Sequence, residues 1–197
     1  MGKLFHLNSS ASETALIKRC KLGEARAQRE LYQRYAGAML TICRRYLPRA
    51  EEAEEVLSDG FVKVFQRLHQ FQSKATLGAW IKTIMVREAL NYLRYRKNHF
   101  QEWEEQQHFS SHSPGDEAAN AEHLLSLIAA LPTGYRTVFN LYALEGYSHR
   151  EIGAMLDISE STSKSQLRKA RRHLQNLLRQ SENSFCQTSL APYVHEQ

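Results

Sequence analysis

The segment that most constrains the fold of this chain is Tyr147–Arg172, whose residue pattern predicts two helices joined by a tight turn. Ser148 and Glu151 have the spacing of a capping box, so the first of these helices is expected to begin near His149. Apolar residues then follow at the spacing of a buried helix face. They are Ile152, Met155 and Leu156.

The turn between these two predicted helices lies at Asp157, Ile158 and Ser159, where the apolar spacing is interrupted. Ile158 is expected to fill the gap between the helices, and Ser159 is expected to cap the second one. The second helix begins at Glu160 and continues into a strongly basic stretch. Its buried face is expected to comprise Leu167, Ala170, Leu174 and Leu177.

The opposite face of the second helix carries hydroxyl groups at its start and cations further along. A hydroxyl-rich first turn at base edges, followed by cationic turns at phosphates, is typical of a helix-turn-helix in the DNA major groove. An ordinary helical hairpin with a solvated basic face is the alternative, but the caps, the turn and the charge asymmetry together favour DNA binding. The predicted contacts are Ser161, Thr162, Lys164, Ser165, Arg168, Lys169, Arg171 and Arg172.

Charge is distributed unevenly along the 197 residues, whose formal net charge is +5. Residues 164–180 contain six Lys or Arg residues and no acid, whereas residues 51–59 contain five acids and no base. A basic patch suits a polyanion such as DNA. The separate acidic patch indicates that the chain also binds something other than DNA.

The composition excludes several classes of protein. The three cysteines are far apart and lack a CxxC spacing, which is typical of reduced thiols in a cytosolic protein. No apolar run approaches the roughly 18 residues of a membrane span, and the N-terminus lacks the apolar core of a signal peptide. No catalytic constellation, phosphate-binding glycine loop or metal-ligand cluster is evident. We therefore expect a soluble, cytoplasmic protein that is not an enzyme and has no cofactor or metal.

Four helices are predicted in the N-terminal half, over residues 13–23, 25–46, 50–69 and 77–98, after a polar extension of residues 1–12. Apolar residues recur in each helix at intervals of three or four, which is the pattern of amphipathic helices that share a core. These segments therefore predict a small helical bundle.

The third of these helices carries a cluster of acids in its first half. A helix dipole favours acids at that end, so the cluster either stabilises the helix or binds a partner, and the pattern leaves both open. The acids are Glu51, Glu52, Glu54, Glu55 and Asp59.

The fourth helix interleaves cations with aromatic residues. Such a surface suits single-stranded nucleic acid, because phosphates bind Lys and Arg while bases stack on the rings at about 1–3 kcal/mol each. Aromatic residues at helical spacing also occur in ordinary cores, so the helix alone leaves a purely structural role open. The cations and polar residues of its expected outer side are Lys82, Arg87, Asn91, Arg94, Arg96 and Lys97, and the aromatic residues are Trp80, Tyr92 and Tyr95.

Regular periodicity stops over residues 99–120, where acidic, Gln-rich and Ser-Pro-Gly sequence predicts a linker. Residues 121–180 then predict four helices, and residues 181–197 form a tail without clear periodicity. The second of these four helices is defined by Tyr135, Val138, Phe139, Leu141, Tyr142 and Leu144, and it is expected to end at Gly146. The predicted fold class is all-α, with two small helical domains, residues 13–98 and 121–180, joined by a flexible linker.

Two blocks of this sequence together resemble the extracytoplasmic-function (ECF) group of the sigma-70 family of bacterial RNA polymerase sigma factors. The first block is DGFVKVFQRLHQF, which continues as FQSKATLGAWIKTIMVREALNYLRYRK. The second block is ALPTGYRTVFNLYALEGYSHREIGAMLDISESTSKSQLRKARRHL. A basic helix or a helix-turn-helix alone is not specific for this family. The occurrence of both blocks in this order, on either side of an acidic linker, is highly specific for it. The resemblance covers roughly residues 15–180.

The resemblance implies that the chain directs core RNA polymerase to promoters and initiates transcription. The helix over residues 54–66 is similar to the family segment that docks on the coiled coil of the polymerase β′ subunit. The C-terminal module also resembles the part of the family that sits on the β flap. The implied polymerase-binding residues are Glu54, Glu55, Asp59, Phe61, Val62 and Gln66.

The resemblance also implies two separate DNA contacts. Residues 147–172 are similar to the module that reads the −35 element as a duplex. The loop of residues 72–76 is similar to one that holds a base flipped from the −10 element, and residues 80–97 are similar to the helix that holds the opened −10 strand. The implied −10 contacts are Gln72, Ser73, Lys74, Trp80, Lys82, Arg87, Asn91 and Arg94.

Two positions depart from the family pattern. Arg87 stands where family members often carry Asn, so the −10 preference of other members is not expected to apply. Ser163 stands where a buried aliphatic residue is usual in the recognition helix. Its hydroxyl is expected either to bond to a backbone carbonyl or to leave the helix less tightly packed.

A helix-turn-helix regulator that binds duplex DNA without being a polymerase subunit is the alternative function. Such a regulator would have no use for a surface suited to an unpaired strand. A third hypothesis is a helical module that binds another protein through its exposed hydrophobic residues. The ECF group also implies an anti-sigma factor as a partner, possibly a membrane-linked one, and no small-molecule substrate.

Overall fold

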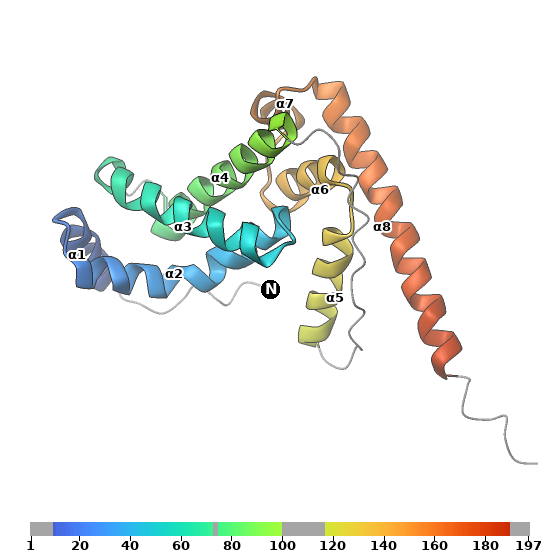
Figure 1. The fold of residues 1–197 in the computed structure, drawn as a ribbon, viewed down its shortest axis with the longest axis horizontal. Coiled ribbons are helices and arrows are strands. Elements are labelled where there is room, and N and C mark those ends of the chain that lie inside the picture. The colour runs from blue at the N-terminus through green and yellow to red at the C-terminus, as the bar shows by residue number, and fades with distance from the viewer. Residues whose placement is uncertain (1–9, 73–74, 100–116, 190–197) are drawn as a thin grey trace, which may run out of the picture. The chain divides into compact units, whose positions relative to one another are not determined.

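The computed structural model describes residues 10–72, 75–99 and 117–189, and every regular element in these ranges is helical. The chain divides into two compact units, residues 1–101 and residues 102–197 (Figure 1). The predicted all-α class with two helical domains is therefore confirmed.

The first unit contains four α-helices and one short 3₁₀ turn among its described residues. Helices α2, α3 and α4 all pack against one another, and α1 packs against α2 (Figure 1). The elements are α1 (Ser10–Lys21), α2 (Ala25–Tyr46), α3 (Ala50–Arg67), η1 (Leu68–Gln70) and α4 (Leu77–His99). The helix predicted over residues 50–69 thus changes to 3₁₀ geometry in its last turn.

The core of the first unit lies where α2, α3 and α4 meet. A fully buried Leu, Ile, Val or Met side chain contributes about 1.5–3 kcal/mol to folding, so this cluster is the main source of the unit's stability. Helices α3 and α4 come closest at Gly60, where an added Cβ would lie 2.3 Å from Met85 Sδ. The largest fully buried side chains here include Leu31, Met39, Tyr46, Val64, Ile81 and Met85.

Cys20 and Cys43 are free thiols buried in the first unit. Burial raises the pKa of the Cys43 thiol to about 12 and raises the pKa of Cys20 as well. Since the thiolate is the reactive form, both side chains behave as small apolar residues at neutral pH.

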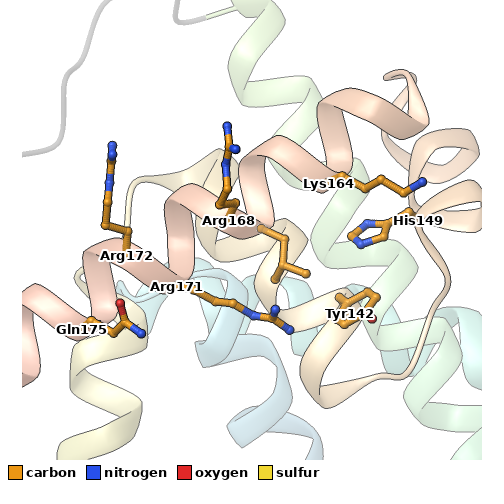
Figure 2. A pocket seen from close by; sticks show the side chains of 8 residues that line it. Tyr142, His149, Lys164, Arg168, Arg171, Arg172 and Gln175 are labelled. Carbon is orange, nitrogen blue, oxygen red and sulfur yellow. The ribbon is translucent and has the colours of Figure 1, made fainter.

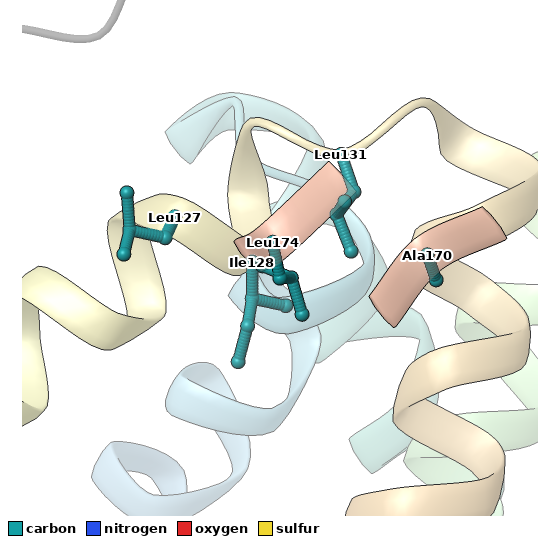
Figure 3. Packing of buried hydrophobic residues seen from close by; sticks show 5 residues of the cluster. All are labelled: Leu127, Ile128, Leu131, Ala170 and Leu174. Carbon is teal, nitrogen blue, oxygen red and sulfur yellow. The ribbon is translucent and has the colours of Figure 1, made fainter. Parts of the chain in front are cut away.

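The second unit is built around the long helix α8, against which α5, α6 and α7 pack. A buried cluster joins α5 to α8, and Figure 3 shows the side chains of Ile128 and Leu174 side by side at its centre. The cluster comprises Leu127, Ile128, Leu131, Ala170 and Leu174, with Tyr135, Phe139 and Leu177 packed at its edge. The elements are α5 (Glu117–Ala129), α6 (Thr133–Phe139), the π-helical segment η2 (Asn140–Leu144), α7 (His149–Leu156) and α8 (Glu160–Ser189).

A buried arginine holds the junction between α5 and α6. The Arg136 guanidinium, only 2% exposed, donates from Nη1 to the carbonyl of Ala129 at 2.7 Å and to that of Leu131 at 3.2 Å. Carbonyls at the end of a helix have no partner within the helix, and a cation there also complements the helix dipole. Arg136 therefore satisfies the end of α5 from inside the unit.

Two helices of the second unit extend beyond the expected boundaries. Helix α5 begins at Glu117, inside the predicted linker, because residues 117–122 are rich in the strong helix formers Ala and Glu. Helix α8 continues to Ser189, inside the predicted tail, and neither Gly nor Pro occurs between residues 154 and 191 to end it.

The helix predicted to end at Gly146 differs from expectation in its second half. After Phe139 the chain widens into a π-helix, in which the backbone N–H of Glu145 donates to the carbonyl of Asn140 at 3.0 Å. The wider turn changes which side chains face the core. Tyr142 and Leu144, which belong to the apolar pattern of this predicted helix, are 37% and 39% exposed.

The turn between α7 and α8 forms as the sequence predicts. Ser148 and Glu151 make a complete capping box, and the Ser159 hydroxyl accepts the backbone N–H of Thr162 at 3.0 Å. Asp157 ends α7 in the left-handed conformation, at φ 55°. Ile158 is half-buried between the two helices, as expected.

Gly153 is the point of closest approach in this turn. The backbone N–H of Ile158 donates to the Gly153 carbonyl at 3.0 Å, and a Cβ on Gly153 would lie only 2.8 Å from the Ile158 carbonyl oxygen. That oxygen belongs to the backbone and cannot rotate away. A side chain at position 153 would therefore force the two helices apart.

We expect Gly153→Ala to lower the free energy of unfolding of the second unit by about 1–3 kcal/mol, the usual cost of overpacking. Chemical denaturation followed by circular dichroism measures this change. Gly134→Ala is the matched control, since the nearest atom to its added Cβ would be a side-chain oxygen at 3.7 Å. A Gly153→Ala variant as stable as the Gly134→Ala variant would contradict the argument.

Candidate functional site

The first turn of α8 presents a connected group of hydroxyls. Ser159 Oγ lies 2.8 Å from both Ser161 Oγ and Thr162 Oγ1, and the Ser165 hydroxyl donates to the Thr162 carbonyl at 2.9 Å. Ser161 is exposed, whereas Thr162 and Ser165 are half-buried. The exposed end of this group is suited to hydrogen bonds with base edges.

Further along α8, the basic side chains line an open concavity of about 480 Å³ (Figure 2). Figure 2 shows Arg168 and Arg172 pointing to one side, while Arg171 reaches toward Tyr142. The Arg171 guanidinium lies 5.8 Å from the centre of the Tyr142 ring. The lining residues are Tyr142, His149, Lys164, Leu167, Arg168, Arg171, Arg172 and Gln175.

Lys169 does not belong to this concavity. Its ammonium lies 6.0 Å from the centre of the Tyr135 ring, against α6. Four of the five predicted basic contacts on α8 therefore line the concavity. The fifth, Lys169, lies elsewhere on the exposed surface of the helix.

His149 connects three elements of the second unit. Its ring stacks on Tyr142 of η2, with centroids 4.6 Å apart and planes inclined by 17°. Its Nδ1 lies 2.9 Å from the hydroxyl of Ser163, which is completely buried in α8. The partner of the Ser163 hydroxyl is therefore a histidine ring nitrogen and not the backbone carbonyl that was one of the two expectations.

Sequence reasoning missed His149, Tyr142 and Gln175 as members of this site. The sequence indicates His149 only as the start of a helix, and Tyr142 only as part of the apolar pattern of the preceding helix. The π-helical turn that exposes Tyr142 leaves no clear pattern in the sequence, since it breaks the helical period for only one turn. A polar Ser163 at an expected core position was the available signal that a polar partner lies nearby.

A second candidate surface is the outer side of α4. Trp80, Arg87, Asn91 and Arg94 recur at intervals of seven, four and three, so they form one row along the helix. Arg87, Asn91 and Arg94 are exposed, and Trp80 is half-buried with its ring centroid 5.5 Å from that of Phe71. Tyr95, at 61% exposure, flanks the row. The row is suited to phosphates and unstacked bases.

Lys82 and Arg96 lie on a different side of α4 from this row, contrary to their grouping from the sequence. With about 100° of rotation per residue, Lys82 falls opposite Asn91, on the stripe that carries buried Met85. Lys82 is accordingly half-buried, and the Arg96 guanidinium pairs with Glu52 of α3 at 2.9 Å. Both cations therefore face the interior side of the bundle.

The loop before α4 is described only in part. Gln72 is exposed, as a contact with DNA requires. Ser73 and Lys74, the other predicted loop contacts, lie outside the described residues.

The third candidate surface is the outer side of α3. Glu55, Asp59, Val62 and Gln66 form a row of exposed residues at intervals of four and three. Val62 is 53% exposed, so the row combines negative charge with an apolar centre. Glu54 is exposed beside it, with its carboxylate 4.0 Å from Arg44 of α2.

Phe61, predicted as a polymerase contact, is not part of this surface. It is only 3% exposed, and its ring packs 4.6 Å from Tyr32 and 6.1 Å from Phe65. The spacing explains the error: Phe61 stands next to Val62 in the sequence, but neighbouring residues on a helix point about 100° apart. Its role is to hold α3 against α2.

Two ion pairs fix α4 against α3. Lys63 pairs with the buried carboxylate of Glu88, and Glu52 pairs with Arg96. All four side chains lie between the helices that carry the second and third surfaces. These pairs therefore set the angle at which the outer rows of α3 and α4 are presented.

No group of three or more His, Cys, Asp or Glu side chains among the described residues could hold a metal ion. No helix in the same part of the chain is long and apolar enough to cross a membrane.

Two regions of the chain match one known family. Residues 31–99 match Sigma-70 region 2, and residues 121–174 match Sigma-70 region 4. The ECF RNA polymerase sigma-E factor of Escherichia coli (strain K12) is 26% identical over 184 residues, which cover 86% of this chain and 96% of that protein. The sigma-E factor of Haemophilus influenzae is 25% identical over 179 residues, covering 84% and 94%.

The fold matches as well. The sigma factor RpoE of Bartonella quintana, solved in complex with the anti-sigma factor NepR, has a TM-score of 0.52 at 20% identity, covering 77% of this chain and 96% of that one. The chain belongs to the sigma-70 family. Within that family it is an ECF sigma factor, a non-catalytic RNA polymerase subunit that directs the polymerase to promoters.

We expect Lys63→Met to lower the free energy of unfolding by about 2 kcal/mol, because it leaves the Glu88 carboxylate buried without its cation. The double variant Lys63→Met/Glu88→Leu should lose less, since no buried charge remains. Denaturant unfolding of the wild type, both single variants and the double variant completes the cycle. Strictly additive losses would show that the pair does not couple α3 to α4.

Proposed function

We propose that this sigma factor divides its work between its two units. Residues 13–98 bind core polymerase and the opened −10 strand, and residues 121–180 bind the −35 element as a duplex. Residues 99–120 connect the two, so that engagement of one unit raises the effective concentration of the other at the promoter. The observation that carries this proposal is that an acidic surface lies on α3, whereas two basic surfaces lie on α4 and α8.

The −35 assignment is supported by the α7–α8 turn and the side chains around it. The exposed Ser161 precedes the four cations that line the concavity, so hydroxyls would meet base edges while cations meet phosphates. Lys169 contributes from the neighbouring exposed surface of α8.

The −10 assignment is supported by the row on α4. Unstacking and unpairing a base costs a few kcal/mol. Stacking on an aromatic ring returns about 1–3 kcal/mol per base, and Arg87 and Arg94 supply positive charge for the exposed phosphates. Asn91 adds an amide for base edges, and Gln72 lies at the start of the loop that would receive a flipped base.

The polymerase assignment is supported by the acidic and apolar row on α3. Its negative charge is unsuited to DNA, and Val62 supplies an apolar contact at its centre. We propose that the β′ coiled coil docks on Glu54, Glu55, Asp59, Val62 and Gln66, and that the second unit also contacts the β flap.

We also propose that the protein is cytoplasmic and is held inactive by an anti-sigma factor, which is either soluble or membrane-linked. The ECF group supports this, and the solved relative of similar fold is itself a complex with an anti-sigma factor. The inhibitor would compete for the polymerase-binding surface or for the DNA-binding surfaces.

The test is promoter selection with purified components. Core RNA polymerase and the full-length protein are incubated with a pool of random-sequence duplexes, and the retained DNA is sequenced and transcribed. We expect two enriched elements at a fixed separation and a defined start site. Enrichment of a single duplex site without polymerase would favour the helix-turn-helix regulator instead.

Charge reversal on α3 should weaken polymerase binding. We expect Glu54→Lys/Glu55→Lys/Asp59→Lys to raise the Kd for core polymerase at least about ten-fold, through lost complementarity, as measured by fluorescence anisotropy. Glu24→Lys/Glu30→Lys is the matched control, since these exposed acids pair with Arg19 and Arg34 in the same unit. Equal affinity of the two variants would remove the docking role of α3.

Truncation on α4 should impair strand opening. We expect Arg87→Ala/Asn91→Ala to reduce transcription from a fully paired template by about ten-fold or more, since contacts to the open strand offset the cost of melting. A template melted in advance over the −10 element should restore much of the activity. Arg29→Ala, an exposed arginine of α2, should leave both templates unaffected. An equal defect on both templates would argue against a role in opening.

A further inference from the structure

His149 is the one histidine among the lining residues of the α8 concavity. Its ring is held in place on two sides, by the stack on Tyr142 and by the contact of Nδ1 with Ser163 Oγ. Figure 2 shows the ring beside the Lys164 ammonium and the Tyr142 ring, toward which Arg171 extends. An anion between Lys164 and Arg171 would therefore lie next to the imidazole.

Cations predominate around His149. From α8 it faces Lys164, with Arg171 beyond the Tyr142 ring, and on its own helix Arg150 follows it. The acids nearby are Glu160, whose carboxylate pairs with Lys164 at 2.6 Å, and Glu151, which is engaged in the capping box. The remaining neighbours are the uncharged Tyr142 and Ser163.

Neither nearby acid titrates close to neutral pH. A hydrogen bond from Lys164 lowers the pKa of Glu160, and hydrogen bonds from the Ser148 hydroxyl and backbone N–H lower the pKa of Glu151. Both carboxyls are thus ionised throughout the range from about pH 5 to 8, in which histidine changes its charge. Among the side-chain types at this site, only histidine ordinarily changes its charge within that range.

We propose that the concavity is a seat for one backbone phosphate of the bound duplex, and that binding of this phosphate is coupled to protonation of His149. The proposal rests on duplex binding by the second unit, as set out under the proposed function. The phosphate contacts Lys164, Arg171 and the imidazolium, while Ser163 accepts the Nδ1–H from the buried side.

The proton balance follows from the charges. A phosphate bound in the concavity adds negative charge beside His149, and an opposite charge nearby favours the protonated imidazole. Binding therefore takes up a proton from solvent at His149. By linkage, duplex affinity rises as the pH falls through the range in which histidine protonates, and the site binds more weakly at higher pH.

The test uses the holoenzyme and a duplex selected as described above. Its Kd is measured at about pH 6 and about pH 8 at constant ionic strength, because phosphate contacts are sensitive to salt. We expect the wild type to bind at least about three-fold more tightly at the lower pH, within the limit of ten-fold per pH unit for one proton. A wild-type affinity that does not depend on pH would overturn the proposal.

Three variants assign the effect to His149. His149→Gln keeps a hydrogen-bonding group toward Ser163, and His149→Phe keeps the stack on Tyr142, so at least one of them should fold normally. Both should lose the pH dependence. His173→Gln removes an exposed histidine of α8 that does not line the concavity, and it should keep the dependence. Retention of the effect in both His149 variants, or its loss in the His173 variant, would overturn the proposal.

Neutral methylphosphonates, introduced one at a time into the duplex, identify the ligand. Replacement of one phosphate should abolish the pH dependence in the wild type. If no single replacement abolishes the dependence, the phosphate seat is wrong although duplex binding stands. If no duplex binds at any pH, the −35 assignment fails and this proposal fails with it.

Discussion

The close approach of two backbones at Gly153 is the constraint on which the DNA-binding half of this protein depends. Because no side chain separates Gly153 from the Ile158 carbonyl, α7 and α8 meet at a short and sharply defined turn. Their proximity brings His149, at the start of α7, within 2.9 Å of the buried Ser163 on α8. The concavity lined by Tyr142, His149 and the α8 cations is a consequence of that geometry.

In the first unit, some charged side chains pair between helices and others are exposed. Its ion pairs, Lys63 with Glu88 and Glu52 with Arg96, lie between α3 and α4, so they orient the helices and are not available to partners. The other acids of α3 are exposed, and so are Arg87 and Arg94 on the outer side of α4. One small bundle thereby presents two surfaces of opposite charge, which suits a protein that holds both a polymerase subunit and DNA.

A sigma factor catalyses no reaction of its own. It acts by binding core polymerase and promoter DNA through surfaces that are correctly positioned for each. Opening a promoter is unfavourable by a few kcal/mol for each unstacked base, and stacking and phosphate contacts on the open strand offset this cost. In the proposed function, duplex contacts made by the second unit position the first unit at the promoter. If one duplex phosphate also binds with a proton at His149, the strength of that anchoring varies with pH.

The local sequence was sufficient for the helices, the all-α class, the capping box at Ser148 and the recognition helix, because caps, apolar spacing and turn residues act over only a few positions. The two sequence blocks were sufficient for the family. Other features depended on residues distant in the chain: the burial of Phe61 against Tyr32, the inward side of Lys82, and the partner of Ser163 on another helix. The exposure of Tyr142 likewise followed from a π-helical turn. Helical periodicity states which residues share a face, but packing between helices decides which faces meet and which side chains remain for partners.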